Sequence, residues 1–324
     1  MINAILVHEP GGPEVMQWET VKVPDPGPGE IRLRHTTVGF NMIDTYRRKG
    51  LYPCPLPFIP GSEAAGVVEA VAEDVTTVKA GDRVVYAISD IGAYCEQRII
   101  QAEQVVKIPD EVSDDTAAAC FLKGLTAWYL IHKTWQLKAG DTILVYAAAG
   151  GVGTILCQWA KKLSANVIGV VGADEKIKIA ADNGCDQVIN YSTQNIPSSV
   201  KEMTSGRGVD VVFDSMGLAT FNDSLDCLRP RGLMVTYGNA TGAVPPVDIL
   251  DLMKKGSLYL TRPTLLHYTS DRHELEQGAQ NLFDTIASGD IKILVNQVFE
   301  LKDAASAHAL VESKKTTGAT IFHC

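Results

Sequence analysis

The sequence predicts a two-domain protein, in which a β domain comes first and an α/β domain with a parallel sheet follows. Three observations predict this fold class. The chain has 324 residues, more than one average domain holds. Its first 110 residues consist of short β-like runs separated by Gly- and Pro-rich turns. From Asp141 onward apolar strands alternate with helices, which is typical of βαβ units.

The β-like runs of the first region predict a compact, barrel-like domain. They are IRLRHTTVGF (31–40), AAGVVEAV (64–71), DRVVYAI (82–88) and AYCEQRII (93–100). A helix is then predicted across 114–137, where apolar residues recur three and four apart.

The α/β region begins with a continuous apolar strand, a glycine-rich turn and a helix. Strands are predicted at 141–147, 166–171, 209–215, 232–238 and 257–263, with helices at 151–163 and 220–228. Beyond Pro263 we predict helices at 274–289 and 303–313 and β-like runs at 291–301 and 319–323, and we expect this tail to return to the first domain. The predicted division is 1–124, 125–263 and 264–324.

Composition argues against several classes of protein. The net charge of −9 does not favour a nucleic-acid binder, which needs a basic face. No apolar run is long enough to span a membrane and no secretory signal is evident, so we expect a cytoplasmic protein. The seven cysteines contain no CxxC pair, which predicts reduced, mostly buried thiols.

The motif DTILVYAAAGGVG predicts a dinucleotide site. It follows the GxGxxG pattern with Ala148 in the first position, Gly150 in the second and Gly153 in the third, and Gly151 leaves further room. Such glycines allow a tight turn and a close approach of the backbone to a pyrophosphate at the helix N-terminus. The alternative is a glycine-rich turn that only packs the helix.

The end of the next strand indicates which dinucleotide binds. An NAD site usually has an acidic residue there, but this strand runs into Gly172, and Asp174 lies beyond the turn. Lys176 and Tyr191 offer a cation and a phenol, which suit a 2′-phosphate. We therefore predict NADPH, with a merely solvated Lys176 as the alternative.

Two later strand ends are expected to line the same crevice, because ligands in such sheets lie beyond the carboxyl ends of the strands. The residues at these ends are Asp214, Ser215 and Gly217 after one strand and Tyr237, Gly238 and Asn239 after the other. Ordinary turns use the same residue types, so only their recurrence favours a site.

Eight stretches together resemble a known family. They are GGPEVM, GFNMIDTYRRKGLYP, PGSEAAGVVEAV, AGDRVVYA, GLTAWYL, AAAGGVG, VINY and TRP, and they run through nearly the whole chain. The chain resembles quinone oxidoreductases of the zeta-crystallin type in the medium-chain dehydrogenase/reductase superfamily. The resemblance implies a GroES-like β-barrel catalytic domain, a Rossmann domain with a doubly wound parallel sheet, and a homodimer, which we expect to form through an edge strand near 257–262.

The resemblance also implies hydride chemistry without a metal. Zinc-dependent relatives carry a catalytic Cys and His, and the corresponding positions here are Asn41 and Ser62. An amide and a hydroxyl are poor zinc ligands, and the histidines form no HxxxH pattern. We predict no metal site.

The resemblance further assigns candidate site residues. Asn41 and Tyr46 are the catalytic candidates, as hydrogen-bond partners for a carboxamide, ribose or quinone oxygen, and Tyr52 and Asn239 are assigned to the substrate pocket. Asp44 is expected to brace the loop, and Arg47 and Arg48 to face solvent. The predicted cofactor-binding residues are Asn41, Ile43, Asp44, Tyr46, Thr126, Tyr129, Gly150, Gly151, Val152, Gly153, Gly172, Lys176, Tyr191, Ser215, Gly217, Tyr237, Gly238, Asn239, Arg262 and Lys314, the last with an exposed helix-end lysine as its alternative.

The predicted activity is reduction of a small quinone by NADPH in the cleft between the domains. Reduction of an activated C=C bond in an enal or enone is the enzymatic alternative, since it uses the same hydride geometry. The alternative from another class is a non-catalytic NADPH-binding protein with a structural or RNA-binding role.

Overall fold

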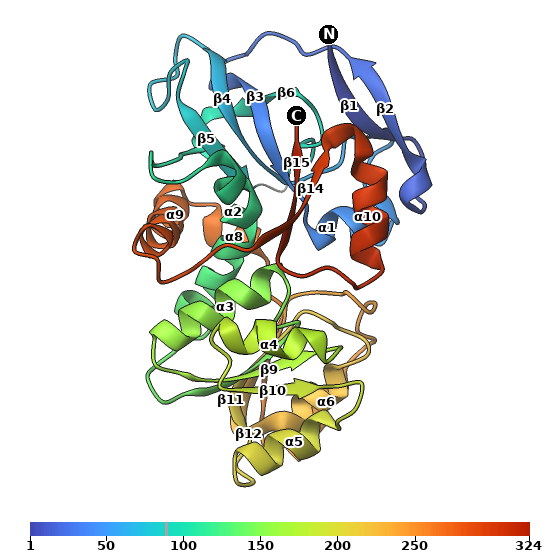
Figure 1. Cartoon of the computed structure of the whole chain (residues 1–324), viewed down its shortest axis with the longest axis vertical. Helices are drawn as coiled ribbons and strands as arrows, with labels where there is room; N and C mark the ends of the chain where they lie inside the picture. The colour runs from blue at the N-terminus through green and yellow to red at the C-terminus, as the bar shows by residue number, and fades with distance from the viewer. Residues whose placement is uncertain (88–89) are drawn as a thin grey trace. The chain divides into compact units, whose positions relative to one another are not determined.

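The computed structural model describes residues 1–87 and 90–324, so Ile88, the last residue of one predicted strand, lies outside the described residues. The chain forms two compact units (Figure 1). Unit 1 comprises Met1–Leu125 and Thr269–Cys324, and unit 2 comprises Thr126–Tyr268. No helix in the described ranges is long and apolar enough to cross a membrane.

Unit 1 is built on a seven-stranded sheet. Six strands follow the order β14-β15-β3-β4-β5-β7, and β6 pairs with β3. A separate hairpin of β1 and β2 is tied on by bridges from Ala4 to Cys95 and from Val7 to Phe58. The strands are β1 (Ile2–Val7), β2 (Met16–Val21), β3 (Glu30–Gly39), β4 (Glu63–Val71), β5 (Arg83–Ala87), β6 (Gln97–Gln101), β7 (Val106–Lys107), β14 (Val295–Glu300) and β15 (Ala319–His323).

The helices of unit 1 come from both of its chain segments. The chain passes from unit 1 to unit 2 inside α2, and Phe121 of α2 stacks on Phe283 of α9 with ring centroids 5.8 Å apart. Asp271 caps α9, because its carboxylate accepts from the backbone N–H groups of His273 and Glu274. The helices are α1 (Met42–Arg48), α2 (Asp114–Tyr129), α9 (Arg272–Ala287) and α10 (Ala304–Glu312), with 3₁₀ turns at Pro13–Val15, Ala102–Gln104 and Leu301–Asp303. Helix α8 (Leu265–Thr269) contains the boundary at which the chain returns from unit 2 to unit 1.

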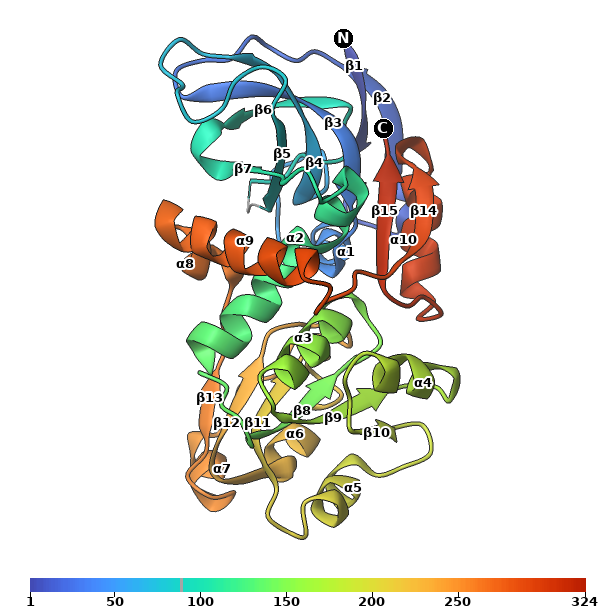
Figure 2. The same cartoon turned by 60° about the vertical axis from the view of Figure 1, so that its left-hand side comes forward.

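Unit 2 is a doubly wound sheet of six parallel strands, which confirms the predicted fold class. Figure 2 shows the order from left to right as β13, β12, β11, β8, β9 and β10. The strands β8 and β11 in the middle are buried apolar runs, as expected where helices cover both faces. The strands are β8 (Thr142–Tyr146), β9 (Asn166–Val171), β10 (Gln187–Asn190), β11 (Val209–Asp214), β12 (Leu228–Thr236) and β13 (Tyr259–Thr261).

The helices of unit 2 connect these strands. Helix α3 contacts β8 and β9, α4 contacts β9 and β10, and α6 contacts β11 and β12. Figure 1 shows α3 and α4 on one side of the strands and α5 and α6 on the other. The helices are α3 (Gly151–Lys162), α4 (Glu175–Asp182), α5 (Ile196–Met203), α6 (Phe221–Cys227) and α7 (Ile249–Lys254), preceded by a π-helical turn at Leu130–Thr134.

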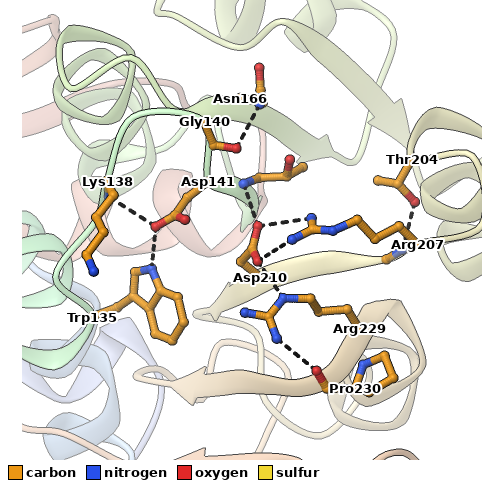
Figure 3. Close-up of polar contacts among 12 residues, drawn as sticks. Trp135, Lys138, Gly140, Asp141, Asn166, Thr204, Arg207, Asp210, Arg229 and Pro230 are labelled. Carbon is orange, nitrogen blue, oxygen red and sulfur yellow. Dashed lines mark hydrogen bonds and ion pairs between the residues drawn. The ribbon is translucent and has the colours of Figure 1, made fainter.

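A buried carboxylate ties together the amino ends of the central strands (Figure 3). Asp210, near the start of β11, accepts from the backbone N–H of Thr142 at 2.9 Å. It also accepts two hydrogen bonds from Arg207 and one from Arg229. This ionic cluster lies at the amino ends of β8 and β11, whereas the glycine-rich turn follows the carboxyl end of β8.

Candidate active site

The glycine-rich turn joins β8 to α3 as predicted. Ala147 adopts a left-handed conformation with φ 52°, and Gly150 caps α3. Gly153 lies against the end of the strand, where a Cβ atom would come 2.2 Å from the carbonyl oxygen of Ala147. A larger residue at Gly153 would push the helix away, which is the third-glycine role in the fingerprint. The N–H groups of the first turn of α3 have no carbonyl partner in a preceding turn and can face an anion.

Gly172 and Tyr191 lie side by side at the ends of β9 and β10. A Cβ at Gly172 would lie 2.5 Å from the hydroxyl oxygen of Tyr191, whose side chain is exposed. Lys176 is half-buried in the first turn of α4, and burial lowers its pKa. Asp174, the rival candidate for ribose binding, accepts from Asn190 Nδ2 at 2.7 Å. The ends of β9 and β10 therefore offer a cation and a phenol. The carboxylate of Asp174 already accepts a hydrogen bond from the amide of Asn190.

The ends of β11 and β12 meet through their backbones. A Cβ at Gly238 would lie 2.2 Å from the carbonyl oxygen of Ser215, and Gly217 has φ 84°. The carboxylate of Asp214 accepts from the backbone N–H groups of Met216 and Gly217 and braces the turn. Both glycines have steric reasons for being glycine, whether or not a ligand binds. Tyr237 and Asn239 follow at the same end, both partly exposed.

Three further cofactor candidates lie in unit 2. Thr126 and Tyr129 are buried at the end of α2, and Tyr129 stacks on Tyr268 with centroids 4.4 Å apart. Arg262 follows β13, and its Nη1 donates to the carbonyl oxygen of Thr236 at 3.0 Å. Their ligand-binding roles stay predictions.

The loop that opens α1 is built around Asn41 and Asp44. Asn41 caps the helix, and its backbone N–H donates to Asp44 Oδ2 at 2.9 Å. The other carboxylate oxygen of Asp44 accepts from the hydroxyl of Ser62, to which Arg47 Nη1 donates at 2.7 Å. Burial raises the pKa of Asp44 to about 6, although the bond from Asn41 and the charge of Arg47 oppose the rise. Asp44 braces the loop, as expected.

A second buried carboxylate, Glu63 at the start of β4, holds the side chain of Asn41. Asn41 Nδ2 donates to Glu63 Oε2 at 2.8 Å, and Lys123 Nζ lies 3.1 Å from the same oxygen. The backbone N–H of Leu122 donates to Glu63 Oε1 at 2.6 Å. Lys123 is only 6% exposed, so the ion pair lies inside the unit.

The remaining candidates of unit 1 lie on α1 or near helix ends. Tyr46 and the substrate-pocket candidate Tyr52 are partly exposed and pack edge to face, with centroids 5.6 Å apart. Ile43 is half-buried on α1. Lys314 follows α10 with a φ of 63° and is exposed, so its alternative as a helix-end lysine stays open.

The expectation that Arg48 faces solvent is wrong. Its side chain is fully buried, and Nη1 hydrogen-bonds to His308 Nδ1 at 2.9 Å while Nη2 bonds to Glu312. On the other side of the imidazole, the hydroxyl of Tyr94 lies 3.0 Å from His308 Nε2. The residue faces inward because α10 supplies an acceptor and a carboxylate there. Arg47 is half-buried and donates to Ser62, so it is not simply solvated either.

Sequence reasoning missed Glu63 and Lys123 as parts of this site. Lys123 interrupts the apolar run AAACFLKGL, in which a lysine that cannot reach solvent needs an anion. This interruption is the feature of the sequence that indicates a buried ion pair. It does not indicate that the partner is Glu63, which lies 60 positions away.

A dinucleotide-binding turn on a doubly wound sheet, joined in one chain to a β-barrel unit, defines a two-domain dehydrogenase. Residues 151–285 match the family model of zinc-binding dehydrogenases, and residues 27–110 match the alcohol dehydrogenase GroES-like domain.

Individual relatives match over nearly the full length. Quinone oxidoreductase 1 of Escherichia coli is 48% identical and 2-haloacrylate reductase of Burkholderia sp. is 45% identical, each over 99% of both chains. The crystal structure of E. coli quinone oxidoreductase complexed with NADPH has a TM-score of 0.98 at 47% identity, covering 99% of this chain and all of that one. The chain belongs to the quinone oxidoreductase family of medium-chain dehydrogenases/reductases.

The residues at the two zinc-ligand positions do not fit a zinc ion. Asn41 directs its N–H groups at Glu63, and the hydroxyl of Ser62 is shared between Asp44 and Arg47. Neither side chain is a thiolate or imidazole, and two cations already occupy the surroundings. Within residues 1–87 and 90–324 no group of three or more His, Cys, Asp or Glu side chains could hold a metal.

Proposed function

We propose that this protein is an NADPH-dependent quinone reductase that needs no metal at Asn41 and Ser62. The observation that carries the proposal is a full-length match to a quinone oxidoreductase solved with NADPH, together with a dinucleotide turn of the right geometry. When bound, NADPH supplies a hydride from its nicotinamide ring. The protein's own residues bind it and orient the acceptor, since catalysis of this kind rests on positioning.

Unit 2 offers the groups that would hold NADPH. The first turn of α3, which begins at Gly151, would bind the pyrophosphate, and Lys176 and Tyr191 would bind the 2′-phosphate. In unit 1 the hydroxyls of Tyr46 and Tyr52 are the candidate donors to a quinone oxygen. A quinone is already a good electron acceptor, so hydrogen bonds can replace a Lewis acid.

A second activity is favoured by a specific observation. The 2-haloacrylate reductase of Burkholderia sp. is nearly as similar as the quinone oxidoreductases, and its name indicates reduction of an activated C=C bond. Reduction of an enal or enone is therefore the alternative for this chain.

One steady-state experiment decides between them. Small quinones, enals and a 2-haloacrylate are each tested with NADPH and with NADH, and the metal content of the same preparation is measured. We expect quinone-dependent oxidation of NADPH, weaker activity with NADH, and substoichiometric zinc. Turnover of the C=C substrates but not of quinones supports the alternative. If the protein contains stoichiometric zinc and loses activity when the zinc is removed, the proposal that no metal is needed is wrong.

We also infer a homodimer that forms through β13. This strand is an edge of the sheet in unit 2, and the neighbouring surface carries exposed apolar side chains. They are Ile249, Leu250 and Met253 of α7 and Tyr259 of β13, each more than half exposed. An open edge strand beside an apolar patch is the usual signature of a pairing surface.

Cysteine usage supports a cytoplasmic location. Cys157 and Cys185 are unpaired thiols with their sulfur atoms only 3.5 Å apart, and five of the seven cysteines are buried. Neighbouring thiols persist in reducing compartments, so we propose that the protein acts in the cytoplasm.

A further inference from the structure

The side chain of Asn41 is held by charged groups rather than left to turn. Glu63 is fully buried, and its two oxygens accept from Leu122, Asn41 and Lys123. The donors come from α2 and from the loop before α1, while Glu63 begins β4. One buried carboxylate thus connects three elements around Asn41.

The chemistry of Glu63 decides which end of the Asn41 amide faces it. An ionised carboxylate carries no hydrogen, so only the amide nitrogen can lie 2.8 Å from Glu63 Oε2. Lys123 Nζ lies 3.1 Å from the same oxygen and pairs with it as a cation. The second contact of Asn41 Nδ2 is the carbonyl oxygen of Gly39 at 3.5 Å, so the N–H groups are directed at protein acceptors.

Packing prevents the amide from turning over. Asn41 is 4% exposed, and the chain at Gly39 runs so close that a Cβ there would lie 2.5 Å from Glu63 Oε2 and 2.1 Å from the carbonyl oxygen of Ala118. On its other side the Asn41 side chain caps the N-terminus of α1, as a hydrogen-bond acceptor. An oxygen has two lone pairs, so acceptance is the only hydrogen-bonding capacity that Asn41 has left.

We propose that Glu63 and Lys123 are positioning residues that hold the Asn41 amide in one orientation, so that a ligand at Asn41 meets its oxygen and never its N–H groups. The inference rests on the proposed function and deepens it. A quinone oxygen accepts hydrogen bonds only, and therefore cannot use Asn41. The carboxamide N–H₂ and the ribose hydroxyls of NADPH are donors, and they can.

An exchange of amide and carboxylate tests this orientation. In Asn41→Asp two carboxylates face each other, and we expect the Kd for NADPH to rise at least about tenfold, with a lower Tm. In the double variant Asn41→Asp/Glu63→Gln the new amide donates to the new carboxylate, the total charge is unchanged, and Lys123 keeps an anion beside it. Position 41 still presents an oxygen, so we expect the Kd for NADPH and the KM for quinone to return to within about threefold of wild type.

A second pair of substitutions isolates the positioning role. Glu63→Leu/Lys123→Met removes both charges together, which leaves no unpaired buried ion. We expect it to fold, and to bind NADPH about tenfold more weakly because the amide of Asn41 is no longer fixed. Isothermal titration gives the Kd without any need for turnover.

The outcomes separate this inference from the proposed function. A wild-type protein that binds NADPH but reduces no quinone ends the proposed function, while the binding measurements still test the orientation of Asn41. Unchanged NADPH affinity in Asn41→Asp or in Glu63→Leu/Lys123→Met overturns the inference. A folded Asn41→Asp/Glu63→Gln variant that binds NADPH normally but loses quinone turnover about a hundredfold also overturns the inference. That result would mean that the N–H groups of Asn41 bind the quinone.

Discussion

At the scale of single residues, Asp44 makes the stability of the protein depend on pH. Burial raises its pKa from 3.8 to about 6, so the folded chain binds this proton more tightly than the unfolded chain. The contribution of Asp44 is therefore most favourable below about pH 4 and falls as the pH rises to about 6. We expect the free energy of unfolding of the wild type, relative to Asp44→Asn, to fall by about 3 kcal/mol between about pH 4 and about pH 7. Urea denaturation of both proteins at the two pH values measures it.

The comparison with Asp44→Asn is needed because His308 titrates in the opposite sense. Burial lowers the pKa of His308 to about 3, with the charge of Arg48 acting in the same direction. The imidazole of the unfolded chain takes up a proton below about pH 6.5, so the contribution of His308 to the free energy of unfolding falls as the pH falls. The Asp44→Asn variant keeps a side-chain carbonyl oxygen for the backbone N–H of Asn41. A difference between the two proteins that does not change with pH would contradict the role of Asp44.

Lys176 is the residue on which the preference for NADPH is predicted to depend. Lys176→Ala should raise the KM for NADPH about tenfold and leave the KM for NADH unchanged, since only NADPH carries the 2′-phosphate. Lys178→Ala is the matched control, because Lys178 lies two positions along the same helix, is 82% exposed and pairs with Asp182. Equal effects of the two variants, or equal effects on both cofactors, would show that Lys176 is only a solvated lysine.

At the scale of elements, the parts that sequence patterns predicted well are those governed by local rules. The strand 166–171 has the predicted bounds, and the predicted helix 151–163 ends one residue beyond α3. Both follow from apolar periodicity and from the glycines between them. Edge position was also predictable for β13, which lies at the end of the sheet order.

Pairings between distant elements were not predictable in the same way. Arg48 bonds to His308 across 260 positions, and Glu63 bonds to Lys123 across 60. Arginines and lysines are mostly exposed in proteins, so the sequence alone predicts an exposed side chain. Only the folded structure shows the buried carboxylate or imidazole with which these two residues pair. The glycines and the family resemblance were enough to locate the candidate site in the sequence. The charged residues that hold its side chains, such as Glu63 and Lys123, are brought there by tertiary contacts.

The joint between α1 and α10 can be tested with adjacent residues. Arg48 and Lys49 both pair with Glu312, but the Arg48 side chain is 0% exposed and that of Lys49 is 51% exposed. Arg48→Met leaves His308 and the carbonyl oxygen of Gly11 without their donor, and we expect it to lower the free energy of unfolding by about 3 kcal/mol. Lys49→Met should change it by less than about 1 kcal/mol. Similar losses in the two variants, measured by denaturation, would mean that the pairing with Glu312 matters more than burial.

At the scale of the whole molecule, the edge strands β14 and β13 differ in character. β14 is an edge of the sheet in unit 1, and its side chains alternate between exposed and half-buried. β13 is one of the two edges of the sheet in unit 2, the one that follows α7, on which Ile249 is 77% exposed. A strand edge with an apolar surround gains more from pairing than one whose neighbours are solvated, so the proposed dimer should use β13.

Charged substitutions at the two edges test this assignment. We expect wild-type protein to have twice the chain mass of 34.9 kDa by light scattering. Tyr259→Arg/Met253→Arg places two cations opposite their copies in a two-fold interface and should give the monomer mass. Val298→Arg, at a residue 52% exposed on β14, should leave the dimer intact. Because Tyr259 and Met253 are exposed in the single chain, both variants should keep the wild-type Tm when diluted below the dimer dissociation constant. A monomeric wild type, or a dimer that Val298→Arg dissociates and the β13 variant does not, would assign the pairing surface elsewhere.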